Sequence, residues 1–366
     1  MKSSKTNQDG VFKTLHQDLG HGGHYRTIRR DYRDLKDFYI DEERRQKLAG
    51  KNIVSRSMLE TWWLLKGLFY NLSPTRRLLL VLGFVLSMNH MTLQAGGAII
   101  SDNGFLGFAL LLFVLILELK DKLLAHDELE SGRSIQRALM PNSCPELKDW
   151  SVWFDSRPAR EVGGDLVDCL DVGNGSMTIT LADVAGKGLR AALLSSKLQA
   201  TVRALASEVT SLPDLCAKVN SIFHRDSLKS IFASLLVLEL RPDSGTIRYV
   251  NAGHLPPILV TKNDVHEMKK GHLALGLAPS STYEDHVVDL QPGDVFFAFT
   301  DGLTEAQNEQ GVQYGIERLS ERLRQLRHLS AREIGETLFR NIDSFVGEAS
   351  VRDDLSMMVI KRTSEV

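Results

Sequence analysis

The distribution of apolar residues divides the chain into a helical first part and a strand-rich second part. Residues 78–117 are almost continuously apolar, with a polar break near 101–104. From 118 to 139 charged residues surround an incomplete apolar stripe, a pattern that predicts one long helix ended by Pro141. Beyond residue 145 the chain changes to short apolar or alternating runs bounded by Gly, Pro, Asn and Asp, which are typical of β-strands.

Strands dominate this second part, and amphipathic helices arrive in pairs between them. This order predicts an α+β fold in which two antiparallel sheets form a sandwich with helices outside, an α-β-β-α arrangement. The expected strands are 150–156, 165–172, 176–183, 231–240, 246–250, 257–260, 286–290, 295–299 and 355–361, and the expected helices are 189–207, 212–224, 314–326 and 331–346.

The apolar segment 78–117 has the length and composition of a membrane hairpin. A spanning helix needs about 20 apolar residues, and residues 78–100 supply them, whereas 105–117 is shorter. Basic residues flank both ends but not the turn, so both termini are expected in the cytoplasm: Arg76, Arg77, Lys120 and Lys122. We therefore expect two spans in the cell (inner) membrane, in contact with lipid, and a cytoplasmic C-terminal domain. The alternative is a buried hairpin in a soluble dimerisation module.

The remaining patterns complete the expected domain organisation. Residues 60–70 are aromatic and amphipathic, which favours a membrane–water interface. The helix over 118–139 has the pattern of a linker that packs on its own domain or pairs with its twin in a homodimer. The expected domains are a polar N-terminal region with charged and interfacial helices, the hairpin, the linker helix and a catalytic domain: 1–72, 73–117, 118–143 and 144–366.

Composition excludes some classes of function. Charged residues make up 25% of the chain and the net charge is −2, so nothing supports bulk binding of nucleic acid. The histidines do not form the H-E-x-x-H pattern of a zinc hydrolase. Cys144, Cys169 and Cys216 lack metal-ligand spacing, and we expect them to be unpaired thiols in a reducing compartment.

The candidate chemistry lies in acidic residues at the ends of apolar runs. Asp183 and Asp301 each end an expected strand, Asp353 precedes one, and Asp165 follows two glycines at the start of another. Carboxylates that converge from separate strand ends are what a pair of hard divalent cations requires, either Mn²⁺ or Mg²⁺. Such a pair activates water for attack on a phosphoester.

Seven short motifs between residues 134 and 360 resemble, in content and order, the metal-dependent type 2C (PPM) serine/threonine protein phosphatases of the bacterial SpoIIE/sigma-regulator branch. They are Gln136–Pro141, Arg157–Arg160, Val162–Asp165, Asp183–Gly188, Asn251–His254, Phe299–Gly302 and Asp353–Asp354. The resemblance implies the sandwich fold and two metal ions.

The same resemblance assigns the ligands. Asp183 is expected to bridge both metals, and Asp301 and Asp353 to complete the first site. The carbonyl of Val184 supplies a further ligand, and Asp165 binds a metal or orients water. Asp354 is expected to contact the ligand residues and not the metals themselves.

Gly164 is expected to let the backbone turn sharply beneath Asp165. Three other neighbouring residues have two open interpretations each. Arg160 and Lys187 either approach substrate phosphate or form ordinary surface contacts. His254 either acts near the site or is a hydrogen-bonded structural histidine.

One position departs from the eukaryotic branch, which carries a leaving-group histidine where this chain has Ala185. Without a Ser or Cys nucleophile motif, we expect direct attack of water. The expected function is a membrane-tethered phosphoserine/phosphothreonine phosphatase acting on a regulatory phosphoprotein, by resemblance an anti-sigma-factor antagonist. The alternatives are a non-catalytic phosphoprotein-binding module and a small-phosphoester hydrolase.

Overall fold

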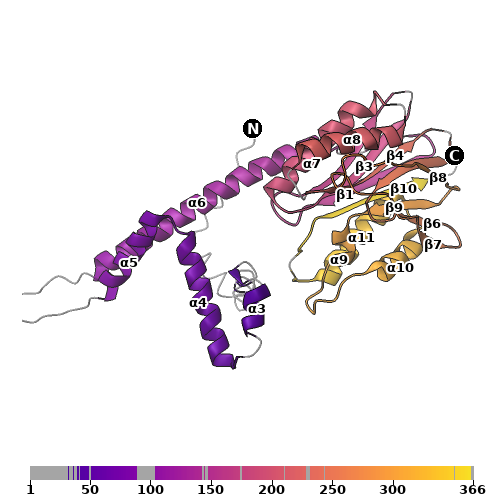
Figure 1. The fold of residues 1–366 in the computed structure, drawn as a ribbon. Coiled ribbons are helices and arrows are strands. Elements are labelled where there is room, and N and C mark those ends of the chain that lie inside the picture. The colour runs from indigo at the N-terminus through magenta and orange to yellow at the C-terminus, as the bar shows by residue number, and fades with distance from the viewer. Residues whose placement is uncertain are drawn as a thin grey trace, which may run out of the picture. The chain divides into compact units, whose positions relative to one another are not determined.

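The computed structural model describes residues 51–88 and 104–363, apart from 142–143, 145–146, 174, 210, 228–230, 243 and 350, together with 32, 36, 39, 40 and 42–48. The chain forms two compact units, Met1–Leu123 and Leu124–Val366 (Figure 1). Each unit is described separately below.

The second unit is built on two five-stranded antiparallel sheets. One sheet has the order β1-β10-β9-β6-β7 and the other β2-β3-β4-β5-β8. The strands are β1 (Trp150–Arg157), β2 (Asp165–Asp171), β3 (Met177–Val184), β4 (Ala233–Leu240), β5 (Thr246–Ala252), β6 (Ile258–Val260), β7 (Val265–Glu267), β8 (His286–Asp289), β9 (Val295–Phe299) and β10 (Leu355–Arg362).

The sheets pack face to face, and helices cover their outer faces (Figure 1). Apolar residues of both sheets form the central core, among them Ile179, Leu236, Phe296 and Met358. Helices α7 (Leu189–Ala206) and α8 (Leu212–Asp226) pack on one sheet. Helices α10 (Ile316–Leu326) and α11 (Ala331–Val346) pack on the other. The predicted sandwich is confirmed.

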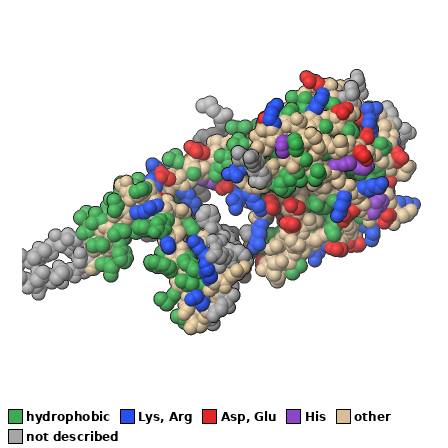
Figure 2. Space-filling model, viewed as in Figure 1, with side chains coloured by type: hydrophobic (Ala, Val, Ile, Leu, Met, Phe, Trp, Pro, Cys, Tyr) green, Lys and Arg blue, Asp and Glu red, His purple; other side chains and the backbone are tan. Residues whose placement is uncertain are grey.

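The first unit contains α3 (Glu42–Leu48), α4 (Ile53–Asn71), α5 (Pro74–Met88) and the beginning of α6 (Gly104–Leu139). Helices α5 and α6 touch at glycines: a Cβ on Gly107 would lie 2.7 Å from the Gly83 carbonyl oxygen. Arg76 of α5 forms ion pairs with Glu118 and Asp121 of α6, each at 2.6 Å. Hydrophobic side chains gather on the outside of both helices (Figure 2).

The membrane hairpin predicted over 78–117 is not supported. Among the residues that the structure describes, no helix combines the length and the apolar character needed for a span. Residues 89–103, the end of the first predicted span and the turn, lie outside the described residues. The second predicted span and the predicted linker helix are one continuous helix, α6.

Three further features differ from the sequence-based expectation. The short elements β7 and α9 (Asp301–Glu305) were not predicted, because three to five residues are too few to establish a periodicity. Cys144 and Cys169 form a disulfide, so the prediction of unpaired thiols is wrong for this pair. Only Cys216, which is buried, is a free thiol among the described residues.

Candidate metal and phosphate site

Four separate segments of the sandwich each contribute one predicted metal ligand. Asp165 is the first residue of β2 and Asp183 the penultimate residue of β3, and the strand register pairs them directly. Asp301 begins α9 immediately after β9. Asp353 lies two residues before β10. Because paired residues on adjacent antiparallel strands have Cβ atoms about 5 Å apart, the first two carboxylates are neighbours.

Glycines allow these segments to approach each other. A Cβ on Gly164 would lie 2.9 Å from the carbonyl oxygen of Val184 and 3.7 Å from a carboxylate oxygen of Asp183. A Cβ on Gly302 would lie only 2.1 Å from the carbonyl oxygen of Asp354. Neither position has room for a larger residue. The glycines next to Asp165 and Asp301 therefore bring the four segments into contact.

Electrostatic interactions show that the carboxylates share one region. The pKa of Asp183 is raised to about 6. Burial is the largest cause, and the charges of Asp301, Asp353 and Asp354 add to it. Burial and the charge of Asp353 also raise the pKa of Asp301. Like charges grouped in a partly buried place disfavour the ionised forms. The region therefore carries a negative charge that a cation would relieve.

Asp165 is the most buried of these carboxylates, with only 3% of its surface exposed. The Thr300 hydroxyl donates a hydrogen bond to its Oδ2 at 2.8 Å. The Ser195 hydroxyl of α7 donates to its carbonyl oxygen at 3.3 Å. Burial, together with the charge of Asp183, raises the pKa of Asp165 well above its usual value. Its carboxylate is thus fixed in orientation behind the more accessible Asp183.

Asp354 holds the glycine-rich loop in place. Its two carboxylate oxygens accept hydrogen bonds from the backbone amides of Ala159 at 2.8 Å and Gly164 at 2.6 Å. From the other side, the side-chain amide of Gln136 in α6 donates to the Gly163 carbonyl oxygen at 2.8 Å. The backbone amide of Gly163 in turn donates to Oε1 of Gln136 at 3.2 Å. The loop that leads into Asp165 is therefore anchored on two sides.

Lys187 places a positive charge against Asp353. Its ammonium donates to Asp353 Oδ2 at 2.7 Å and to the carbonyl oxygen of Arg352 at 2.7 Å. Its charge also lowers the pKa of Asp301, although burial and Asp353 raise it more. The side chain is about half exposed. In this structure the partly exposed Lys187 side chain thus forms an ion pair with a predicted metal ligand.

Two other predicted site residues lie differently. Arg160 is exposed, and its charge is not among the causes of the raised pKa values of Asp165, Asp183 and Asp301. His254 is buried. Its Nδ1 lies 2.7 Å from the Ser234 hydroxyl, and the Asn251 side chain bonds its backbone. Burial lowers the pKa of His254 to about 4, so it is neutral at physiological pH. These contacts favour its interpretation as a structural histidine.

The donor set fits a hard divalent cation, because it consists of carboxylate and carbonyl oxygens. As they stand, however, no three His, Cys, Asp or Glu side chains within the described part of the chain are arranged to hold a metal ion. The ion pair with Lys187 occupies one carboxylate oxygen of Asp353, a predicted ligand.

Sequence reasoning missed several residues that support the site. Thr300 and Ser356 are buried, and the Ser356 amide donates to Thr300 Oγ1 at 3.0 Å beside Asp165. The only available signal for Thr300 was its position directly before Asp301. Gln136 belongs to a motif that was noted, but nothing in the sequence indicated that its side chain reaches residue 163.

Comparisons with known proteins show which sequences the chain is similar to. Residues 173–363 match the family model described as stage II sporulation protein E (SpoIIE). The chain is 27% identical over 264 residues to the protein IcfG of Synechocystis. The match covers 64% of this chain and 41% of IcfG. It is 24% identical over 239 residues to the phosphoserine phosphatase RsbU of Bacillus subtilis, covering 64% of this chain and 70% of RsbU.

A solved structure shares the fold. The SiaA-PP2C domain of Pseudomonas aeruginosa superposes with a TM-score of 0.58 at 22% identity, and the match covers 66% of this chain and 98% of that domain. The similarity lies in the two-sheet sandwich with its outer helices.

Proposed function

The chain belongs to the SpoIIE family of PP2C-type phosphatase domains, and from this membership we propose that it is a metal-dependent phosphoserine/phosphothreonine protein phosphatase. The observation that carries the proposal is the convergence of carboxylates from separate segments around Asp183. Their mutual repulsion is unfavourable for the protein alone, and it is the arrangement that divalent cations stabilise.

We propose that Asp183, Asp301 and Asp353, with the carbonyl oxygen of Val184, hold the cations, and that Asp165 supports them from the buried side. When bound, two ions of Mn²⁺ or Mg²⁺ supply Lewis-acid chemistry: they lower the pKa of water and offset the charge of a phosphoester. The hydrogen bond that Thr300 donates orients the Asp165 carboxylate, and Asp354 holds the backbone by accepting from the Gly164 amide.

The protein's own groups contribute binding and orientation. Gly186 and Gly188 have positive φ angles and open space where a Cβ would lie, so phosphate can approach their backbone. Helix α7 begins directly after them, and the N-terminus of a helix favours an anion. Lys187, once released from Asp353, is placed to contact the phosphate. The Ala185 side chain has no titratable proton, so the leaving group takes its proton from water or from another residue.

The test is phosphate release by the full chain from a phosphoserine protein, with Mn²⁺ and with EDTA. We expect Mn²⁺-dependent release that falls at least a hundredfold in Asp301→Asn, because a charged ligand is lost. Asp171→Asn is the matched control, since Asp171 lies exposed at the opposite end of β2 from Asp165.

Three outcomes of this test would contradict the proposal. Equal activity of Asp301→Asn and the wild type would remove the metal mechanism. Release from a small phosphoester but not from the phosphoprotein would indicate a small-molecule hydrolase. Phosphoprotein binding without release would indicate a non-catalytic module.

We propose a small phosphorylated regulator, such as an anti-sigma-factor antagonist, as the substrate. Family membership and the similarity to the phosphoserine phosphatase RsbU support this. The matched region spans less than half of IcfG, so the comparison with that protein concerns this part only. Phosphopeptide mass spectrometry of cells with and without the protein would identify the phosphoserine that accumulates.

We also propose that α5 and the first half of α6 associate with the inner membrane, with the phosphatase unit in the cytoplasm, and that α6 contributes to a homodimer. Large apolar side chains exposed on both helices support contact with lipid, including Phe84, Phe105 and Phe108. Leu123 and Ile135, exposed on α6, support a dimer contact. Recovery of the protein in the soluble fraction after cell lysis would contradict the membrane association. A monomer in sedimentation in detergent would contradict the homodimer.

A further inference from the structure

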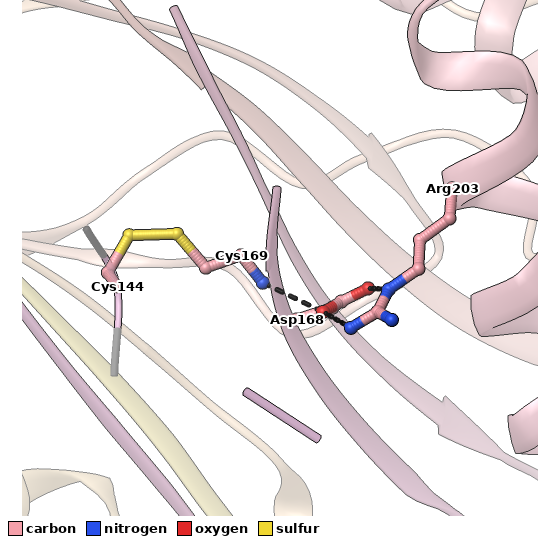
Figure 3. The surroundings of a disulfide bond; sticks show 4 residues. All are labelled: Cys144, Asp168, Cys169 and Arg203. Atoms are coloured by element: carbon pink, nitrogen blue, oxygen red, sulfur yellow. Dashed lines mark hydrogen bonds and ion pairs between the residues drawn. A yellow bond between two sulfur atoms is a disulfide. The ribbon is translucent and has the colours of Figure 1, made fainter. Parts of the chain in front are cut away.

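The disulfide between Cys144 and Cys169 connects two distinct parts of the second unit. Cys144 lies five residues after the end of α6, and Cys169 is in β2, the strand that begins with Asp165 (Figure 3). Their Cα atoms are 5.6 Å apart, within the range of protein disulfides. The bond therefore fastens the segment after the linker helix to a strand of the catalytic sandwich.

A second, non-covalent attachment lies next to the disulfide. The carbonyl oxygen of Leu139, the last residue of α6, accepts hydrogen bonds from Gln199 at 2.9 Å and Arg203 at 3.0 Å. The Arg203 guanidinium also binds both carboxylate oxygens of Asp168 at 2.7 Å, as Figure 3 shows. Asp168 directly precedes Cys169. The end of α6 and the segment after it are thus held by one polar and one covalent attachment.

The two cysteines differ in accessibility. Cys169 is 8% exposed in the core, whereas Cys144 is only partly buried at the edge of that core. A thiol or disulfide in solution therefore reaches Cys144 first. Cys216 is fully buried and burial raises its pKa to about 12, so it remains an unreactive thiol.

We propose that Cys144 and Cys169 are a reversible thiol–disulfide pair that responds to low-molecular-weight disulfides of the glutathione type. This rests on the cytoplasmic location proposed above, because in a reducing compartment an accessible disulfide exchanges with the thiol pool. The proposal is independent of the phosphatase activity, because it depends only on the sulfur atoms and on the segment they fasten.

The exchange proceeds in two balanced steps. The Cys144 thiolate attacks one sulfur of the small disulfide, forms a mixed disulfide and releases one small thiolate. The Cys169 thiol then loses its proton, and its thiolate attacks the Cys144 sulfur and releases the second small thiolate. The protein pair is oxidised by two electrons and the small disulfide is reduced to two thiols, and the reverse steps open the bond.

The structure indicates what opening the bond changes. Reduction leaves the hydrogen bonds of Gln199 and Arg203 to Leu139 intact but removes the covalent link between Cys144 and β2. The disulfide closes a loop with a sequence separation of 25, and in the chain-entropy model this corresponds to a fall in Tm of roughly 7 to 14 °C on reduction.

The test equilibrates the full chain in glutathione buffers of graded ratio, followed by acid quenching, alkylation of free thiols and peptide mass spectrometry. We expect a linked Cys144–Cys169 peptide that increases with oxidised glutathione and disappears reversibly with the reduced form. Cys216 should stay unlinked throughout and serves as the internal reference. Proteolysis between residues 140 and 149 should accelerate on reduction.

Single variants provide the matched controls. Cys144→Ser should have the Tm of the reduced wild type, and Cys169→Ser should have a lower one, because its hydroxyl is placed in the core. Neither should respond to the glutathione ratio, whereas Cys216→Ser should respond as the wild type does. The proposal is overturned if no linked peptide forms in the most oxidising buffer, if Cys144 links two chains instead, or if the oxidised and reduced wild type have the same Tm.

Discussion

Replacing Asp183 with asparagine should make the metal-free protein more stable while it abolishes metal binding. In the wild type, burial and three nearby carboxylates raise the pKa of Asp183 from 3.8 to about 6. A raised carboxyl pKa means that the folded state binds the proton more tightly than the unfolded state. The contribution of this group to stability is therefore fully present when the pH is below the pKa of the unfolded state, and it is lost as the pH rises from about 4 to about 6.

The magnitude follows from the size of this shift. One pKa unit corresponds to about 1.4 kcal/mol, so a shift of about two units costs up to about 3 kcal/mol at neutral pH. Asparagine has nearly the same shape and cannot ionise, so it removes this cost. For a unit of this size the expected rise in Tm is roughly 6 to 10 °C.

The assay is thermal unfolding in EDTA at pH 5 and pH 7.5, for the wild type, Asp183→Asn and the control Asp171→Asn. We expect the stabilisation by Asp183→Asn at pH 7.5 to be much larger than at pH 5, and the control to follow the wild type. Added Mn²⁺ should raise the Tm of the wild type and of the control only. If Asp183→Asn were less stable than the wild type in EDTA at pH 7.5, the electrostatic account of the cluster would be refuted.

Two further substitutions test other parts of the site. Lys187→Met should tighten Mn²⁺ binding by about two- to fivefold in calorimetry, because the cation no longer displaces a half-exposed ion pair with Asp353. Lys197→Met, which breaks a comparable pair on α7 away from the cluster, should leave the affinity unchanged, and equal effects of both would contradict this. Gly302→Ala should cost roughly 1–3 kcal/mol of stability in urea unfolding, since the new Cβ would lie 2.1 Å from the Asp354 carbonyl oxygen. A fully stable Gly302→Ala variant would show that the approach between α9 and the segment before β10 is not tight.

The regular elements were predictable because their residues carry a local period. The strand predicted at 295–299 is β9 with the same bounds, and the helix predicted at 331–346 is α11 with the same bounds. In α11 a capping box formed by Ser330 and Glu333 marks the start. Buried strands and amphipathic helices leave a signal in neighbouring residues, and sequence analysis uses that signal.

Long-range contacts leave no such signal. Lys187 and Asp353 are 166 residues apart, and the sequence allowed a surface lysine equally well. The pairing of Cys144 with Cys169 depends on how the segment after α6 returns to β2, and cysteine spacing does not encode this path. For the apolar residues of α5 and α6, composition predicts burial in some apolar environment but not in which one.

The central claim is that side chains from four segments together bind paired cations. Calorimetric titration of the full chain with Mn²⁺, beside Asp183→Asn, tests it most directly. The account predicts about two ions per chain for the wild type and no binding by the variant, because Asp183 is the proposed ligand of both ions. Identical binding curves for the two proteins, or no binding by the wild type, would contradict it.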